Sequence, residues 1–238
     1  MLKQILVSSI LVAIVCGYAR DNLSAAALAN DHLVPVDRAF EQNELGAAYR
    51  RLYEQKLLRT PGDVARFIFL PVLKGEERAA SVYRSLDRKN ALPGDYWVTA
   101  TRSSMSLWDC VKPGATVASN ARTIGVRRRD APLPESTARA LHEVWLAMLT
   151  AARPMPTNEI PGESDTMIFS ATNADGTLLR AQAYGFRAKN RALIELGDGL
   201  VQYCDVPASD RAEVARKIEK AAVALLKRII REGGKYHK

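Results

Sequence analysis

The feature that most constrains the fold is a pair of strand-like segments joined by a tight turn within residues 166–186. The turn contains Asp175-Gly176, and because glycine adopts positive φ at no steric cost, this dipeptide indicates a β-hairpin. In the first segment Met167, Phe169 and Ala171 fall on one face, which is the two-residue period of a strand with one buried side. The hairpin therefore locates part of the hydrophobic core.

Other segments divide into strands and helices by their periodicity. Runs rich in β-branched and aromatic residues predict strands over residues 64–70, 80–86, 96–102 and, more weakly, 122–129. Apolar residues at helical spacing predict helices over residues 36–58, 134–152, 189–203 and 210–232. Residues 31–35 are interpreted as a linker and residues 74–77 as a polar connection.

The order of these segments favours one fold class. Strands and helices do not alternate regularly, so a parallel wound sheet is not expected. The prediction is an α+β fold, in which an antiparallel sheet of about five to six strands carries helices packed on one face. Gly197 and Gly199 fall inside the third predicted helix, which they weaken unless their small size lets a strand approach closely.

The N-terminus has the three-part pattern of a secretory signal peptide. Lys3 precedes an apolar run over residues 5–16, and small residues follow it. The run is shorter than the roughly 20 apolar residues that a membrane span needs. Residues 1–19 are the predicted signal peptide, with cleavage after Ala19 or as late as Ala29, and residues 30–238 form a single α+β domain ending in a long amphipathic helix. The alternatives are an uncleaved anchor and a buried N-terminal helix.

Cysteine usage is compatible with export. If Cys16 leaves with the signal peptide, Cys110 and Cys204 remain, and such a pair can form a disulfide in an oxidising compartment. The alternative is two separate buried thiols. Spacing along the chain does not decide between them, because disulfide formation depends on the distance between the two residues in space.

The chain is basic, with a formal net charge of +8. On the last predicted helix one face carries the cations Lys217, Lys220, Lys227 and Arg231, opposite the apolar stripe. Such a face can bind anionic lipid or another polyanion. It can also be an ordinary solvated face, since three glutamates on the same helix interrupt the positive charge. Aromatic residues are not interleaved with these cations, which argues against nucleic-acid binding.

The sequence has no pattern that identifies an active site. It contains no zinc-ligand spacing of histidines or cysteines, no nucleophile elbow and no phosphate-binding glycine-rich loop, so neither a metal nor a cofactor is predicted. The sharpest enzyme hypothesis pairs Cys110 as nucleophile with His142 as base, although nothing near either residue marks it for that role.

The sequence therefore favours an exported protein that acts by binding, in the periplasm or outside the cell, as a non-catalytic accessory module. One alternative is a small exported hydrolase whose site is assembled from distant residues. The other is an envelope-surface protein that binds anionic groups through the basic C-terminal helix. The partner is another envelope protein or an anionic surface, and the sequence does not specify which.

Overall fold

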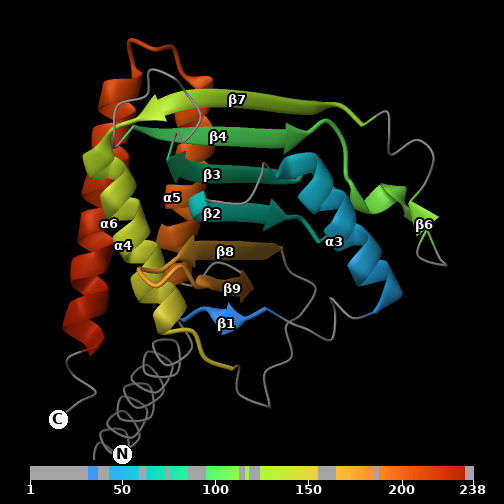
Figure 1. Ribbon diagram of the computed structural model, residues 1–238, viewed down its shortest axis with the longest axis horizontal. Helices are drawn as coiled ribbons and strands as arrows, with labels where there is room; N and C mark the ends of the chain where they lie inside the picture. Colours follow the sequence, from blue (N-terminus) through green and yellow to red (C-terminus); the bar gives the residue numbers. More distant parts are fainter. Residues whose placement is uncertain are drawn as a thin grey trace, which may run out of the picture.

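A seven-stranded antiparallel sheet forms the centre of the fold, and the two-residue strands β5 (Val111–Lys112) and β6 (Thr116–Val117) form a separate pair (Figure 1). In spatial order the sheet contains β1 (Val34–Pro35), β9 (Leu178–Tyr184), β8 (Thr166–Thr172), β2 (Asp63–Leu70), β3 (Arg78–Arg84), β4 (Tyr96–Ser103) and β7 (Val126–Leu133). The computed structural model describes residues 32–36, 43–58, 63–72, 75–84, 95–112, 116–117, 124–154, 165–184 and 188–233. The predicted α+β class and antiparallel sheet are confirmed, with seven strands in place of five to six.

The hairpin that constrains the sequence is present as β8 and β9. Phe169 pairs with Ala181, and both side chains are buried against the helices. Gly176 has a φ of 85°, and its amide donates a hydrogen bond of 3.1 Å to the carbonyl of Asn173. The turn therefore uses glycine where a side chain would be strained.

The two edges of the sheet are the parts that the sequence predicts least well. β7 extends to Leu133, four residues beyond the predicted strand, and contains Pro132, which an edge strand accepts because one of its sides has no partner strand. The Pro132 carbonyl instead accepts a hydrogen bond of 2.5 Å from the Tyr203 hydroxyl. At the other edge Val34 of β1 pairs with Gln182 of β9, so the segment interpreted as a linker contains a strand.

The four described helices are α3 (Glu44–Leu57), α4 (Glu135–Thr150), α5 (Ala188–Asp205) and α6 (Arg211–Gly233). α4 and α5 contact the sheet, and α6 packs on the outside of both. α3 lies on the other face of the sheet and is set apart from the three later helices, as Figure 1 shows. The sheet thus separates two hydrophobic cores, a large one beneath α4, α5 and α6 and a smaller one beneath α3.

A row of polar residues crosses the α3 face of the sheet beside the smaller core. Its members are register partners on six adjacent strands: Arg180, Ser170, Arg66, Ser81, Thr99 and Asp130. Most of them bond to one another or to nearby side chains: Arg66 pairs with Asp63, and Thr99 donates to Asp130. Burial is the main cause that raises the pKa of Asp63 above its ordinary value, while the adjacent Arg66 opposes that rise. Hydrogen bonds and ion pairs within the chain therefore account for these polar residues, and the row is not taken as a binding site.

Candidate functional site

The two cysteines lie on opposite sides of the sheet. Cys204 is on α5 and packs in the large core, whereas Cys110 ends a short 3-10 turn (Trp108–Cys110) and packs in the core beneath α3. Both thiols are free and buried. The predicted disulfide is therefore wrong, because the sheet stands between the two side chains and a disulfide requires their Cα atoms within about 7 Å. The alternative of two separate buried thiols is confirmed.

Neither thiol is placed as a nucleophile. Burial raises the pKa of Cys204 to about 12, and its thiol contacts the carbonyl of Val98 at 3.6 Å. Burial also raises the pKa of Cys110, helped by the nearby carboxylate of Asp109. His142 belongs to α4, on the side of the sheet opposite Cys110, and its Nε2 lies 2.7 Å from the carbonyl of Thr172. The structure thus does not bring Cys110 and His142 together.

The described residues contain neither a metal-ligand cluster nor a membrane-spanning helix. Among them, no group of three or more histidine, cysteine, aspartate and glutamate side chains is placed to hold a metal ion. None of their helices is both long enough and apolar enough to cross a membrane. The predicted signal peptide lies outside the described residues.

Glu77 is a buried carboxylate that the sequence analysis placed in a polar connection. Its side chain is 0% exposed and accepts hydrogen bonds from the Tyr49 hydroxyl, the Ser103 hydroxyl and the Leu107 amide, each at 2.9 Å. The donors come from α3, β4 and the segment after β4, so Glu77 ties three parts of the chain together. Since its oxygens are occupied by internal donors, Glu77 has a structural role.

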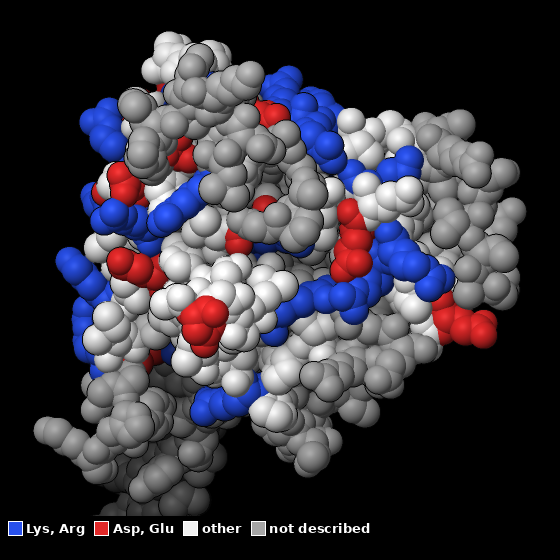
Figure 2. All heavy atoms as spheres, in the orientation of Figure 1, with Lys and Arg blue, Asp and Glu red and all other residues white. Residues whose placement is uncertain are grey.

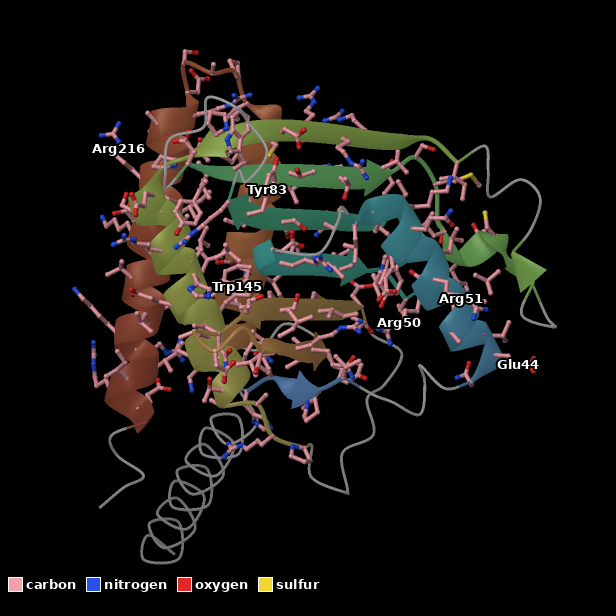
Figure 3. All side chains as sticks on the ribbon, viewed as in Figure 1. Glu44, Arg50, Arg51, Tyr83, Trp145 and Arg216 are labelled. Atoms are coloured by element: carbon pink, nitrogen blue, oxygen red, sulfur yellow. The ribbon has the colours of Figure 1, made fainter. Side chains whose placement is uncertain are left out.

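The outer face of α6 gathers exposed cations. α6 contains seven basic and three acidic residues, a surplus of four that is half of the chain's net charge of +8. We define the outer face by its exposed basic residues Arg216, Lys217, Lys220, Lys227 and Arg231. Figure 2 shows Lys and Arg atoms along the left margin, where α6 lies, and Figure 3 shows Arg216 pointing away from the rest of the protein. The cations predicted from helical spacing therefore share one solvent-facing side.

The acidic residues of α6 are mostly directed toward the protein. Glu219 accepts a hydrogen bond of 2.7 Å from Ser136 in the first turn of α4. Glu232 forms an ion pair of 2.6 Å with Lys189 of α5. Only Glu213 shares the outer face, where it pairs with Lys217 at 2.6 Å. The glutamates that interrupt the charge in the sequence are thus largely removed from the outer face, because the neighbouring helices provide their partners.

Two exposed apolar side chains border these cations. Ile230 is 65% exposed and Val223 is 38% exposed, and helical spacing puts both at one margin of the outer face, next to the basic residues. The inner face, by contrast, buries Ala215, Ile218, Ala222 and Leu225 against α4 and α5. α6 therefore presents a basic surface with exposed aliphatic groups, a combination that suits the interface between water and an anionic lipid layer.

The comparisons add no relative to this geometry: no family model, no curated protein and no solved structure matches the chain.

Proposed function

We propose that the protein is an exported, non-catalytic accessory module that attaches to an anionic membrane surface through the outer face of α6. The observation that carries the proposal is the separation of charge on α6, with cations toward solvent and two of three glutamates bonded to α4 and α5. Each basic residue near an anionic lipid surface contributes about 1 kcal/mol of attraction. Five cations opposed by one glutamate therefore provide about 4 kcal/mol before any contribution from Ile230 and Val223.

Vesicle binding tests the proposed surface. The triple variant Lys220→Gln, Lys227→Gln and Arg231→Gln should bind phosphatidylglycerol-containing vesicles about 100-fold more weakly than the unchanged protein, since three attractions are lost. Pelleting with vesicles, with and without phosphatidylglycerol, measures the partition. Binding should also weaken as salt rises, because exposed charges are screened. Deleting α6 is unsuitable as a test, because Ile218 and Leu225 belong to the core.

A matched control removes the same charge from the opposite side of the sheet. Arg50 and Arg51 lie on α3, as Figure 3 shows, and Arg128 is exposed on the α3 side of β7. The variant with glutamine at these three positions should retain vesicle binding. If it loses as much binding as the α6 variant, net charge rather than the outer face is responsible. If the unchanged protein ignores phosphatidylglycerol, the proposed attachment is wrong.

Export is part of the proposal and rests on the pattern in residues 1–29. We expect the mature protein to begin after Ala19 or Ala29 and to be found in the periplasmic or extracellular fraction. Mass spectrometry of the purified native protein, together with cell fractionation, measures both. A protein that retains Met1 and remains in the cytosolic fraction would remove export from the proposal.

A further inference from the structure

Three arginines stand side by side on β3, β4 and β7, on the face of the sheet that α5 covers. Arg78 is the register partner of Arg102, which is in turn the partner of Arg127. Like charges in such opposed positions repel each other. α5 provides Asp198 and Asp205, which are seven residues apart and so lie on one side of the helix. Asp198 accepts hydrogen bonds of 2.7 and 3.0 Å from Arg78, which neutralises that end of the row.

The β7 end of the row has more positive charge than Asp205 neutralises. The Asp205 carboxylate forms ion pairs with Arg102 at 3.3 Å, Arg127 at 2.6 Å and Arg129 at 3.2 Å. Arg129 also donates to the backbone carbonyl of Asp205 at 3.1 Å. One carboxylate therefore faces three guanidinium groups near the β7 edge of the sheet.

A solvent-open hollow of about 510 Å³ lies beside this cluster, between β7 and the turn that joins α5 to α6. Its polar wall contains Arg129, Arg211, Asp130 and Asp205, and its apolar wall contains Val206 and Pro207. With Arg102 and Arg127 of the adjoining cluster included, four arginines and two aspartates lie in this region, a surplus of two positive charges. The Asp130 carboxylate in addition accepts a hydrogen bond from Thr99.

Two guanidinium groups of this cluster have an unused donor. Within the described part of the chain, the Nε atoms of Arg102 and Arg211 are buried and have no hydrogen-bond acceptor. Arg211 lines the hollow, and Arg102 is joined to its wall through the ion pair with Asp205. Because buried N–H groups are nearly always paired, these two unpaired ones favour an acceptor supplied from outside the chain. Charge surplus and unused donors thus point to the same kind of ligand, an oxyanion.

We propose that this hollow binds a phosphate monoester. A phosphate monoester has a charge between about −1.5 and −2 at neutral pH and three acceptor oxygens, which matches the surplus of two cations and the unused N–H donors. Arginine is well suited to phosphate, because its planar fork donates two parallel hydrogen bonds. The hollow has the volume of a small-molecule site, and Val206 and Pro207 are placed to contact the organic part of the ligand. This inference is independent of the membrane attachment proposed for α6.

Calorimetric titration with inorganic phosphate and with phenyl phosphate tests the inference. Both probes should bind, and phenyl phosphate should bind more tightly because it can also contact the apolar wall. Arg129→Gln should weaken the binding of both probes roughly 10- to 100-fold, as expected for a lost charge-assisted hydrogen bond. The matched control is Arg128→Gln, which removes the same charge from the next residue, whose side chain faces the other side of the sheet. It should change affinity less than about threefold.

Further measurements keep the outcome decisive. If Arg129→Gln does not fold, as judged by circular dichroism, Arg211→Gln replaces it with the same expected loss. The α6 variant that lacks Lys220, Lys227 and Arg231 should bind phenyl phosphate normally, which distinguishes the hollow from the outer face of α6. The inference is overturned if neither probe binds the unchanged protein, if Arg128→Gln weakens binding as much as Arg129→Gln, or if the α6 variant loses phosphate binding.

Discussion

Replacing Gly197 with alanine is expected to lower the free energy of unfolding by about 3 kcal/mol, at the upper end of the usual cost of overpacking a core. A Cβ atom at this position would lie 2.4 Å from Cγ of Phe67 and 2.6 Å from its Cδ1. The Phe67 ring is fully buried and packs against Phe169 with 5.4 Å between the ring centroids, so it has no free space to enter. Urea denaturation followed by circular dichroism measures the change.

Gly199 provides a matched control in the same helix. A Cβ atom there would lie 3.4 Å from Cγ1 of Ile218, which is an ordinary contact. Because alanine is favoured over glycine in a helix interior, Gly199→Ala should raise the free energy of unfolding by up to about 1 kcal/mol. Two identical substitutions two residues apart should therefore have opposite signs. If Gly197→Ala also stabilises the protein, α5 does not approach β2 as closely as the structure shows.

The same two glycines illustrate how far sequence can predict this fold. The hairpin, the central strands and the helices follow from local patterns: turn residues, a period of two, and helical spacing of apolar residues. Their presence in one α+β fold was predictable for that reason. The sequence also raises the idea that glycine allows a close approach within α5, but only the position of Phe67 on β2 decides which of the two glycines serves it.

Contacts between segments that are distant in the chain could not be predicted from the sequence. The sequence allows a disulfide between Cys110 and Cys204, because no residue near Cys110 indicates that it joins the core beneath α3. β1 is two residues long and too short to show alternation. Glu77 stands in a short polar run that resembles an exposed connection. In each case the deciding contact comes from a segment distant in the chain, and residue spacing has no information about it.

The candidate sites show the same division. Helical spacing placed Lys217, Lys220, Lys227 and Arg231 on one side of the last helix, and all four are exposed on α6. The inward direction of Glu219 was missed, because it depends on a partner in α4. Arg127, Arg128 and Arg129 of β7 form a run in the sequence, and in a strand such neighbours point alternately to opposite faces. Sequence spacing could not predict that Arg127 and Arg129 meet at Asp205 together with Arg102 and close to Arg211, because this cluster joins two strands to two helices.

Glu77→Ala is expected to lower the free energy of unfolding by about 4 kcal/mol, because three buried donors lose their acceptor at once. Those donors are the Tyr49 hydroxyl, the Ser103 hydroxyl and the Leu107 amide. Burial, followed by the negative charge of Glu77, raises the pKa of Tyr49 above its ordinary value, so this hydroxyl remains a donor that needs an acceptor. Denaturant titration monitored by tryptophan fluorescence is an apt measurement, since Trp108 stacks edge-on with Tyr49 at 4.9 Å.

Two milder variants separate the hydrogen bonds from the loss of side-chain volume. Tyr49→Phe removes a single donor and leaves Glu77 with Ser103 and Leu107, so we expect a loss of only about 1–2 kcal/mol. Glu77→Gln preserves the shape but replaces one acceptor with a donor group, and should cost about 2 kcal/mol. The expected order of stability is therefore unchanged protein, Tyr49→Phe, Glu77→Gln and Glu77→Ala. An alanine variant as stable as the unchanged protein would mean that Glu77 does not hold α3 against β4, and that α3 is fixed by the apolar contacts of its inner face alone.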